Sequence, residues 1–394
     1  MLKRDLHSRG PWPELRKMPA GLCLVVAAAT CFAVPTGMAA EQNSSAGTDG
    51  EQFNQVFTEW KATLTGLADL RARYRGGDAA ERAAIQAEWQ DRMQAAAATL
   101  EQLVAAARQS YARSPTADPR AMDVLGGTLA EWNRRDECEK AADLGKFLVR
   151  HGCKDAQVLE MAGIAAFAVA DWDAAAAYLQ AAAANRPQVK EGQKLTARGQ
   201  SALSQALEYK AAWAHETKLR QAEAKANDLP RVLLETSQGD ILLELFENEA
   251  PNTVANFLTL VEKGFYNGLV FHRVLPGFMA QGGDPRGDGT GGPGYTIPGE
   301  FGKPEHRLHF RGSLGMARAG GPDSAGSQFY LMFAPRKSLD GQYTVFGRML
   351  AGCDVLARLQ RIDPEQRSRV APDRIIEARV LRKRPHAYVV KKTG

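Results

Sequence analysis

Val270-Phe-His-Arg-Val-Leu-Pro-Gly-Phe-Met-Ala-Gln-Gly-Gly-Asp284 is the stretch around which the second half of this 394-residue chain is organised. It places one permanent cation, Arg273, a few residues from an apolar pair, Phe278 and Met279, and a neutral amide, Gln281. The arginine stays charged at any physiological pH, and the other three side chains carry no charge. This combination suits a neutral, partly apolar substrate.

The stretch resembles the signature of the cyclophilins, a family of peptidyl-prolyl isomerases. Three further blocks continue the resemblance in the family's order: Gly312-Ser-Leu-Gly-Met-Ala317, Ser324-Ala-Gly-Ser-Gln-Phe-Tyr-Leu331 and Leu339-Asp-Gly-Gln-Tyr-Thr-Val-Phe-Gly347. Four blocks in order are far more specific than any single one. The resemblance covers residues 230–384 and implies a closed eight-stranded antiparallel β-barrel with two helices. It also implies an enzyme, a peptidyl-prolyl cis-trans isomerase that accelerates rotation about Xaa-Pro peptide bonds.

The family's active-site motif can be carried onto ten positions of this chain. It implies that Arg273 is the catalytic donor to the prolyl nitrogen and carbonyl region, and that Gln281 orients it. The remaining positions are expected to bind the proline ring and the extended peptide: Phe278, Met279, Ala317, Arg318, Gln328, Tyr330, Leu339 and Tyr343. The substrates would be proline-containing polypeptides. Because rotation about a peptide bond breaks no covalent bond, we expect neither a cofactor nor a metal ion.

Four positions differ from the best-known eukaryotic members of the family. Arg318 stands where asparagine is usual, and Tyr330 replaces a phenylalanine. Ser338 replaces a tryptophan, and Tyr343 replaces a histidine. Arg318 is expected to act through its backbone, so this change puts little in doubt. Tyr330 retains the aromatic ring but must place a hydroxyl group, which puts substrate preference in doubt more than activity.

Some of these residues also have a structural interpretation. Considered alone, Arg273 would be interpreted as a salt-bridged residue of a surface strand. The catalytic interpretation is favoured because the other residues of the active-site motif are also present. His272 lies on the opposite face of an extended strand and is interpreted as structural. The alternative function is a non-catalytic proline-peptide binding or holdase module, with the helical half of the chain as its partner-recognition surface. The presence of Arg273 favours the enzyme.

Neither phosphate nor nucleic acid is an expected ligand. The segment Gly287-Asp-Gly-Thr-Gly-Gly292 formally fits a dinucleotide-binding pattern, but that fingerprint requires a strand, a turn and a helix, and no helical pattern follows it. Asp284 and Asp288 would also repel a phosphate, so we interpret the segment as a loop beside the groove. The formal charge is only +5, and the 50 basic and 45 acidic residues are interleaved rather than gathered in a stripe.

The amino terminus, residues 1–40, is typical of a signal peptide or an N-terminal anchor. Five basic residues lie within 3–17, an apolar run follows at 21–34, and Ala39-Ala40 offers a cleavage site between small residues. The run is shorter than the about 20 residues of a membrane span. We therefore expect the protein to be exported, either periplasmic or secreted, and to be attached to a membrane only if the segment is not cleaved.

A helical region follows the amino terminus. The polar segment 41–50 is rich in Ser, Gly, Asn, Asp and Thr and is predicted to be a flexible linker. Apolar residues then recur at three- and four-residue steps over 53–70 and again over 79–113, and Gly76-Gly77-Asp78 separates the two runs. This pattern predicts a helical hairpin at the start of an α-helical region that spans residues 51–228.

The rest of the helical region contains a repeat-like pattern. Residues 156–187 resemble a tetratricopeptide repeat, in which two antiparallel helices need small residues where they cross, and residues 122–153 form a weaker match. The alternative is an ordinary alanine-rich hairpin. Two units rarely make a stable solenoid alone, so the flanking helices, including one predicted over 196–227, must cover their faces. This region is a candidate surface for a protein partner.

Three cysteines follow the predicted signal segment. Cys138, Cys153 and Cys353 are too few to form a disulfide framework. They have neither Cys-x-x-Cys spacing nor an accompanying histidine cluster, so we expect no metal site. The apolar pattern between the first two predicts that residues 138–153 are mostly one helix.

From Arg231 the period of the apolar residues changes to two, which is typical of β-strands. Asn227-Asp-Leu-Pro230 marks the boundary, because proline disfavours helix at the residue before it. The elements predicted after it are a hairpin over 232–246, a helix over 251–263, several short strands, a helix over 354–361 and a last strand over 374–382. Residues 385–394 are a tail.

Overall fold

The computed structural model describes residues 48–186, 188–190, 193–366 and 370–393. The predicted signal peptide or anchor, residues 1–40, lies outside the described residues. The chain divides into two compact units, one ending at Glu131 and one beginning at Trp132, and each is described by itself. No helix within the described ranges is both long and apolar enough to cross a membrane.

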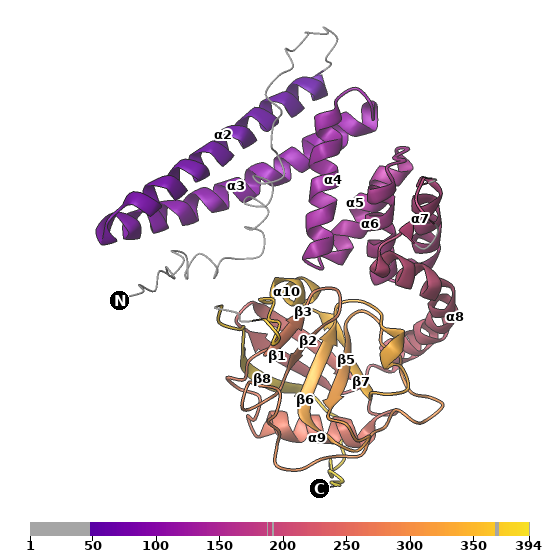
Figure 1. Ribbon diagram of the computed structural model, residues 1–394. Coiled ribbons are helices and arrows are strands. Elements are labelled where there is room, and N and C mark those ends of the chain that lie inside the picture. The colour runs from indigo at the N-terminus through magenta and orange to yellow at the C-terminus, as the bar shows by residue number, and fades with distance from the viewer. Residues whose placement is uncertain (1–47, 187, 191–192, 367–369, 394) are drawn as a thin grey trace, which may run out of the picture. The chain divides into compact units, whose positions relative to one another are not determined.

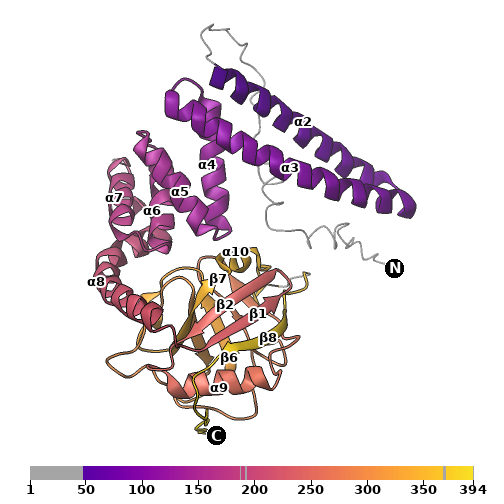
Figure 2. The same ribbon diagram turned by 180° about the vertical axis from the view of Figure 1, so that it is seen from behind.

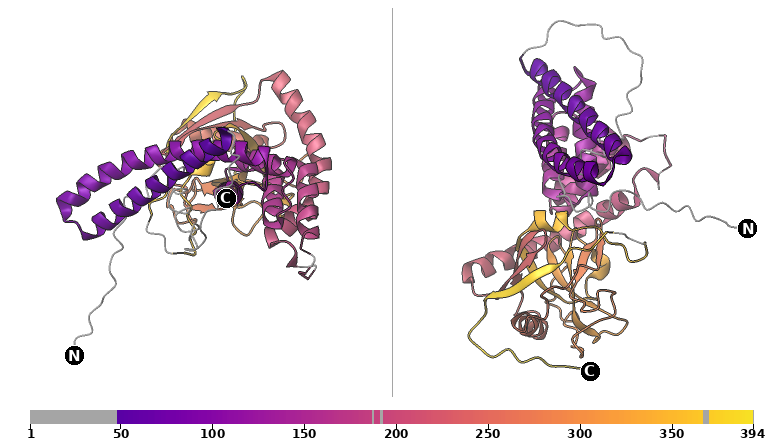
Figure 3. Two further views of the ribbon diagram at one scale, coloured as in Figure 1. Left: turned by 90° about the horizontal axis from the view of Figure 1, so that it is seen from above. Right: turned by 90° about the vertical axis from the view of Figure 1, so that its left-hand side faces the viewer.

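The first unit contains the predicted helical hairpin. Helix α2 (Thr48–Gly76) and helix α3 (Ala79–Arg113) lie side by side along their length (Figure 3). Asp78 ends the turn and caps α3, since its side chain accepts hydrogen bonds from the backbone of Ala80 and Glu81, and the Glu81 side chain bonds back to Asp78. This reciprocal capping box satisfies backbone donors that a helix start leaves free. The hairpin prediction is confirmed.

The predicted flexible linker is corrected at its end. Of residues 41–50, the first seven lie outside the described residues, and the last three belong to α2. A helix needs a preceding turn whose carbonyl groups accept hydrogen bonds from the residues that follow. The apolar run that starts at Phe53, which is fully buried, therefore extends the helix toward the amino terminus, into residues whose composition alone favoured a linker.

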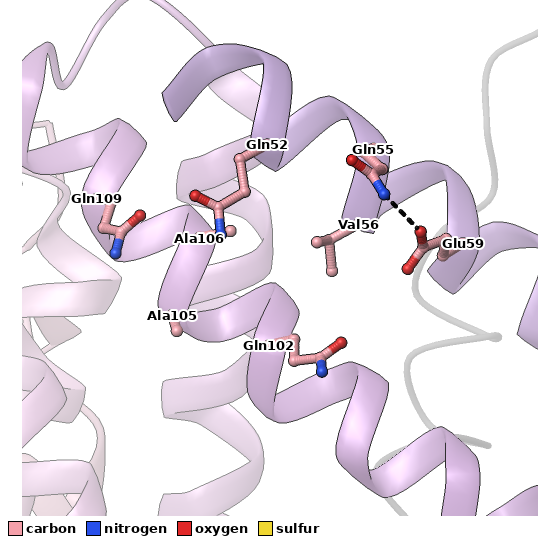
Figure 4. A pocket seen from close by; sticks show the side chains of 8 residues that line it. All are labelled: Gln52, Gln55, Val56, Glu59, Gln102, Ala105, Ala106 and Gln109. Atoms are coloured by element: carbon pink, nitrogen blue, oxygen red, sulfur yellow. Dashed lines mark hydrogen bonds between the residues drawn. The ribbon is translucent and has the colours of Figure 1, made fainter. Parts of the chain in front are cut away.

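The hairpin carries a hollow of about 360 Å³ between its two helices. Four of its eight lining residues are amides, and Figure 4 shows these as Gln52 and Gln55 from α2 and Gln102 and Gln109 from α3. Gln55 donates a hydrogen bond of 3.1 Å to Glu59. Amides and one carboxylate supply no acid–base pair, so we assign no chemistry to this hollow.

Helix α4 crosses the boundary between the units, and four helices of the second unit follow it. Their bounds are α4, Pro119–Arg134; α5, Cys138–Arg150; α6, Ala156–Ala168; α7, Trp172–Ala184; and α8, Ala197–Ala226. We call α5 to α8 the helical segment. The helix predicted over 196–227 is confirmed as α8, and the Thr196 side chain caps its start by accepting from the Gly199 backbone.

Small residues stand where the helices of this segment cross. A Cβ added at Gly145 of α5 would lie 2.6 Å from the Ala162 Cβ of α6, and one at Gly163 of α6 would lie 2.5 Å from Leu179 of α7. Such close approach requires glycine, which is the physical reason that the repeat pattern places small residues there. The tetratricopeptide character of the segment stays a prediction.

Cys138 and Cys153 are not expected to form a disulfide with each other, even in an oxidising compartment. Helix α5 begins at Cys138 and ends three residues before Cys153, so a rise of about 1.5 Å per residue over 13 residues separates them by roughly 20 Å, whereas a disulfide needs Cα atoms within about 7 Å. Burial also raises the pKa of the Cys138 thiol to about 11, which keeps it protonated and unreactive. Non-reducing peptide mapping by mass spectrometry should recover both as unlinked peptides; a peptide pair joined through them would contradict this geometry.

The second unit also contains one eight-stranded antiparallel sheet, which we call the sheet domain. Its strands are β1, Arg231–Thr236; β2, Gly239–Leu245; β3, Arg273–Leu275; β4, Met279–Gly282; β5, Ser313–Arg318; β6, Ala325–Met332; β7, Val345–Ala351; and β8, Ile375–Arg382. Their order is β3-β4-β6-β5-β7-β2-β1-β8. Figure 2 shows that the sheet is curled, and the buried apolar residues Val232, Leu243 and Phe329 belong to one core cluster. The hairpin and the last strand predicted from the apolar period are confirmed.

The prediction of a closed barrel is wrong, because the sheet is an open half-barrel with β3 and β8 at its edges. Closure would require the free edge of β3 to pair with β8. That edge is instead occupied by Ile362, which exchanges two backbone hydrogen bonds with Val274, of 2.7 and 3.1 Å. The segment that precedes β3 contacts the start of β8 through the isolated bridge between Val270 and Arg374 and through backbone hydrogen bonds of Phe271 with Asp373 and of Ile375 with Gly268 and Leu269.

Two helices accompany the sheet, α9 (Pro251–Glu262) and α10 (Cys353–Arg358) (Figure 1). Pro251 stands in the first turn of α9, where its missing N–H costs nothing. The α9 residues Val254, Phe257, Leu258 and Val261 form an apolar stripe that is buried in the core of the sheet. Helix α10 ends three residues earlier than predicted, because Leu359 has an extended backbone.

Candidate active site

Arg273 and Gln281 face each other across the hairpin formed by β3 and β4. Their Cα atoms are direct partners in the antiparallel register, so both side chains lie on the same face of the sheet. Among the described residues, no carboxylate pairs with the half-buried Arg273. Its guanidinium carbon lies 5.8 Å from the centroid of the Phe278 ring. The cation is therefore free to meet a ligand at the edge of an aromatic side chain.

The amide of Gln328, itself held by the glycine-rich loop, fixes Gln281 in place. Gln281 Nε2 donates to Gln328 Oε1 at 2.9 Å. Gln328 Nε2 in turn donates to the carbonyl oxygens of Gly289 and Gly291 at 3.0 and 2.8 Å. The loop carbonyl groups can only accept, so they orient the Gln328 amide with its oxygen toward Gln281. The position of Gln281 beside Arg273 is therefore set by the neighbouring backbone.

An apolar cluster adjoins this polar row. Its buried members are Met279, Tyr330 and Met332, and partly buried side chains pack against them, namely Phe278, Ala317, Leu339 and Tyr343. The strand register explains why residues of β4 and β6 contact one another in this cluster. In the pairing of the two strands, Met279 is opposite Met332 and Gln281 is opposite Tyr330. Leu339 comes from the 3₁₀ turn Lys337–Leu339. The cluster therefore offers an apolar surface against which a small ring can pack.

The Tyr330 hydroxyl has a hydrogen-bond partner in the structure. The sequence alone did not identify this partner. Its oxygen lies 2.8 Å from His309 Nε2, and the two rings are nearly parallel, with centroids 5.9 Å apart. A Cβ at Gly315 would lie 2.3 to 2.5 Å from the outer atoms of the tyrosine ring, its hydroxyl included. The glycine on β5 therefore provides the room that a tyrosine needs here.

Arg318 and Tyr343 form one rim of the cluster. The Arg318 guanidinium lies 4.6 Å from the centroid of the Tyr343 ring, and it donates to the carbonyl oxygens of Gln342 and Ala319 at 3.1 and 3.0 Å. The side chain thus folds back onto its own loop. This geometry leaves the backbone of Arg318, the group expected to meet a peptide, at the end of β5.

The glycine-rich loop beside the site is held by its own aspartate. The Asp284 carboxylate accepts hydrogen bonds from the backbone N–H groups of Arg286, Asp288 and Gly289. Burial opposes ionisation of Asp284, but the backbone N–H groups of Arg286, Gly289 and Gly291 lower its pKa below the usual range. The donors that would cradle a phosphate are already occupied. His272 is buried, and burial lowers its pKa.

The structure brings all ten predicted site residues into this one region. Three further residues were not predicted: Met332, which completes the apolar cluster, His309, and Arg336, whose guanidinium lies 4.7 Å from the Phe278 ring centroid. Met332 lies two residues from Tyr330 on β6, so strand alternation places both on one face. His309 lies 21 residues before Tyr330 in the sequence, and no local pattern connects them.

The sheet domain is similar to proteins of known family. The sequence profile described as "Cyclophilin type peptidyl-prolyl cis-trans isomerase/CLD" matches residues 231–380. A peptidyl-prolyl cis-trans isomerase from Synechococcus elongatus is 52% identical over 120 residues, which are 30% of this chain and 80% of that protein. The chain belongs to the cyclophilin-type peptidyl-prolyl cis-trans isomerases. Its sheet domain therefore carries the isomerase, and the helical half lies outside the matched profile.

Two further comparisons concern the same region. A peptidyl-prolyl cis-trans isomerase from Helicobacter pylori is 46% identical over 150 residues, which are 37% of this chain and 91% of that protein. Among solved structures, a cyclophilin-type isomerase of Cryptosporidium parvum, crystallised in the presence of the dipeptide Ala-Pro, is 32% identical. That alignment covers 38% of this chain and 98% of the other, with a TM-score of 0.35.

Proposed function

We propose that Arg273 performs the isomerisation by donating hydrogen bonds to the twisted Xaa-Pro amide, while the apolar cluster holds the proline ring. The observation that carries this proposal is the unpaired guanidinium of Arg273, which lies at the edge of the cluster and opposite Gln281. Met279, Tyr330 and Leu339 would contact the ring. The backbone of Ala317 and Arg318, with Gln328, would bind the extended peptide on either side of it.

The chemistry of the reaction explains why one cation can suffice. The barrier of about 20 kcal/mol arises because amide resonance is lost as the peptide bond twists. In the twisted state the prolyl nitrogen regains a lone pair, so a fixed donor can bond to it only then. Binding of this kind lowers the barrier rather than the energy of the ground state. A hydrogen bond to a charged group contributes about 1.5–3 kcal/mol, and each 1.36 kcal/mol is about tenfold in rate.

An isomerisation assay on a short Xaa-Pro peptide tests the proposal. The full chain should accelerate cis-to-trans conversion catalytically, at substoichiometric concentration. A non-catalytic proline-peptide binding module would instead bind the peptide without changing the conversion rate, and a holdase would suppress aggregation of an unfolded protein without turnover. Binding without acceleration would therefore overturn the assignment of Arg273 as a catalytic donor.

We infer further that the isomerase assists the folding of exported proteins. The support is the sequence of residues 1–40, in which basic residues precede an apolar run and a site of small residues. Expression with a carboxyl-terminal tag, followed by fractionation and amino-terminal sequencing, should place the mature protein outside the cytoplasm with its first residue near Ala40. Recovery of the uncleaved chain in the cytoplasmic fraction would overturn this inference.

A further inference from the structure

Asp340 connects helix α8 with the floor of the active site. It follows Leu339, and both of its carboxylate oxygens are engaged. Oδ1 accepts the backbone N–H of His309 at 2.8 Å and lies 2.8 Å from His309 Nδ1. Oδ2 accepts the hydroxyl of Tyr209, on α8, at 3.0 Å. Asp340 is thus fixed from two sides, once by the sheet domain and once by the helical segment.

His309 links Asp340 to Tyr330 by hydrogen bonds. The imidazole is fully buried, and a carboxylate can only accept, so Nδ1 carries the proton that points to Asp340. The other ring nitrogen, Nε2, forms a hydrogen bond of 2.8 Å with the Tyr330 hydroxyl, which can accept from a protonated ring or donate to a neutral one. Tyr209, Asp340, His309 and Tyr330 therefore form one hydrogen-bonded chain, which we call the α8 chain. It runs from a helix outside the matched isomerase profile to a wall of the proline pocket.

Aromatic packing fixes the outer end of the α8 chain. The Tyr209 ring stacks on Trp172 of α7, with centroids 5.5 Å apart and an angle of 16° between the planes. Phe310, the neighbour of His309, packs into the same helical core, 5.5 Å from Tyr209 and 4.7 Å from Trp213. His309 thus reaches the pocket while the next residue anchors the same backbone in the helical segment.

A second contact within the second unit reaches the pocket beside Phe278. Asp136, in the turn between α4 and α5, is fully buried. Its Oδ1 accepts the backbone N–H of Gly277 at 2.8 Å, and Oδ2 accepts from Arg361 at 3.0 Å. Gly277 directly precedes Phe278. Two residues from outside the isomerase profile therefore bond next to the pocket, Asp136 to the backbone of Gly277 beside Phe278 and Tyr209 to the side chain of Asp340 beside Leu339.

We propose that Tyr209 is a positioning residue for prolyl isomerisation, and that it acts through Asp340 and His309 on Tyr330 and Leu339. The inference rests on the proposed function of the pocket. Catalysis of this reaction depends on a pocket that fits the twisted amide better than the planar one, so small displacements of its walls reduce the rate. The helical segment is then part of the catalytic unit, in addition to any role in binding a partner.

Tyr209→Phe tests the proposal, because it removes one hydroxyl and retains the ring that packs in the helical core. We expect kcat/KM for an Xaa-Pro peptide to fall about tenfold, mostly in kcat, with KM within about twofold. Tyr178→Phe, which removes the same group from the half-buried Tyr178 of α7, is the matched control and should leave kcat/KM unchanged. In a Tyr330→Phe background, Tyr209→Phe should lower kcat/KM by less than it does alone, because the two residues act through one chain.

The nitrogen-15 chemical shifts of the His309 ring provide a second measurement. They should not change if Tyr209 contributes only to the packing of the helical segment. In the unmodified protein the signals should identify an Nδ1-protonated ring, and Tyr209→Phe should shift them while Tyr178→Phe does not. Equal kcat/KM and equal His309 shifts in the two single variants would overturn the proposal. Failure of the proposed function would look different, since the unmodified protein and Arg273→Ala would then be equally inactive. The NMR comparison and the peptide dissociation constant would still decide whether Tyr209 holds the pocket.

Discussion

Arg273→Ala is expected to lower kcat/KM for Xaa-Pro peptides by about 100-fold to 1000-fold, which is the scale on which a single preorganised transition-state donor contributes. The guanidinium is the one cation that the β3–β4 register places opposite Gln281. Its removal leaves the apolar cluster intact, so peptide binding should weaken much less than turnover. A coupled isomerisation assay at several enzyme concentrations measures the loss, and a titration followed by NMR measures the peptide affinity.

Two controls separate catalysis from folding in this experiment. Arg379→Ala removes an arginine from the exposed edge strand β8, where it pairs with Glu235, and should leave turnover unchanged. Arg273→Lys keeps the charge but loses the planar fork of donors, so it should recover only part of the activity. The melting temperature of Arg273→Ala should stay close to that of the unmodified protein, since such a substitution changes stability by about 0.5 kcal/mol or less. Near-normal turnover in the folded variant would refute the proposed donor.

The local part of the active site could be predicted from sequence because it follows strand geometry. Arg273 and Gln281 lie on two short strands joined by a tight turn containing Pro276-Gly277, and alternation then determines which side chains share a face. Met279 and Tyr330 meet for the same reason, through the pairing of β4 with β6. The resemblance to a family supplied the roles, and the register supplies the physical reason that those positions converge.

The remainder depends on contacts between segments that are distant in the sequence. The barrel stays open because Ile362 forms backbone hydrogen bonds with the edge strand β3. The spacing of apolar residues does not predict which segment pairs with that edge. The hydrogen bond from Tyr209 to Asp340 spans 131 residues, and a tyrosine on an amphipathic helix is ordinarily a packing residue. Sequence periodicity identified α8 as a helix but could not identify what its buried face contacts.

A buried charge cluster holds α8 against the sheet domain. Arg307, which is 3% exposed, donates to both carboxylate oxygens of Glu216 on α8 at 2.9 Å. It also bonds to Glu223 on α8 at 2.5 Å and to Glu249 at 3.2 Å. Burial alone would lower the pKa of Arg307, but the two α8 carboxylates raise it above its usual value. The guanidinium is therefore the common partner of three acidic side chains.

Arg307→Met is expected to destabilise the protein by about 3 kcal/mol, because the buried carboxylates of Glu216 and Glu223 lose their shared partner and keep only Arg220 and Arg348, respectively. The methionine fills much of the volume, so the loss reports charge rather than a cavity. Urea unfolding followed by circular dichroism and tryptophan fluorescence measures it. Lys383→Ala, which breaks the exposed pair with Glu262, is the control and should cost at most about 1 kcal/mol. Combining Arg307→Met with Glu223→Gln should recover part of the stability, because the carboxylate that lost Arg307 is then neutral while Arg348 keeps Glu244 as its partner.

The same cluster should make the attachment of α8 sensitive to acid. Burial raises the pKa of Glu216, but Arg307 and Arg220 outweigh it and hold the pKa below the ordinary value of 4.5. A carboxyl whose pKa is lower in the folded state stabilises the fold fully above its unfolded pKa, and this contribution is lost as pH falls through the folded pKa. Unfolding free energy should therefore drop below about pH 4.5 in the unmodified protein. In Arg307→Met the drop should be smaller, because the main cause of the lowered pKa is gone. An equally steep acid transition in both proteins would show that Arg307 does not hold this junction.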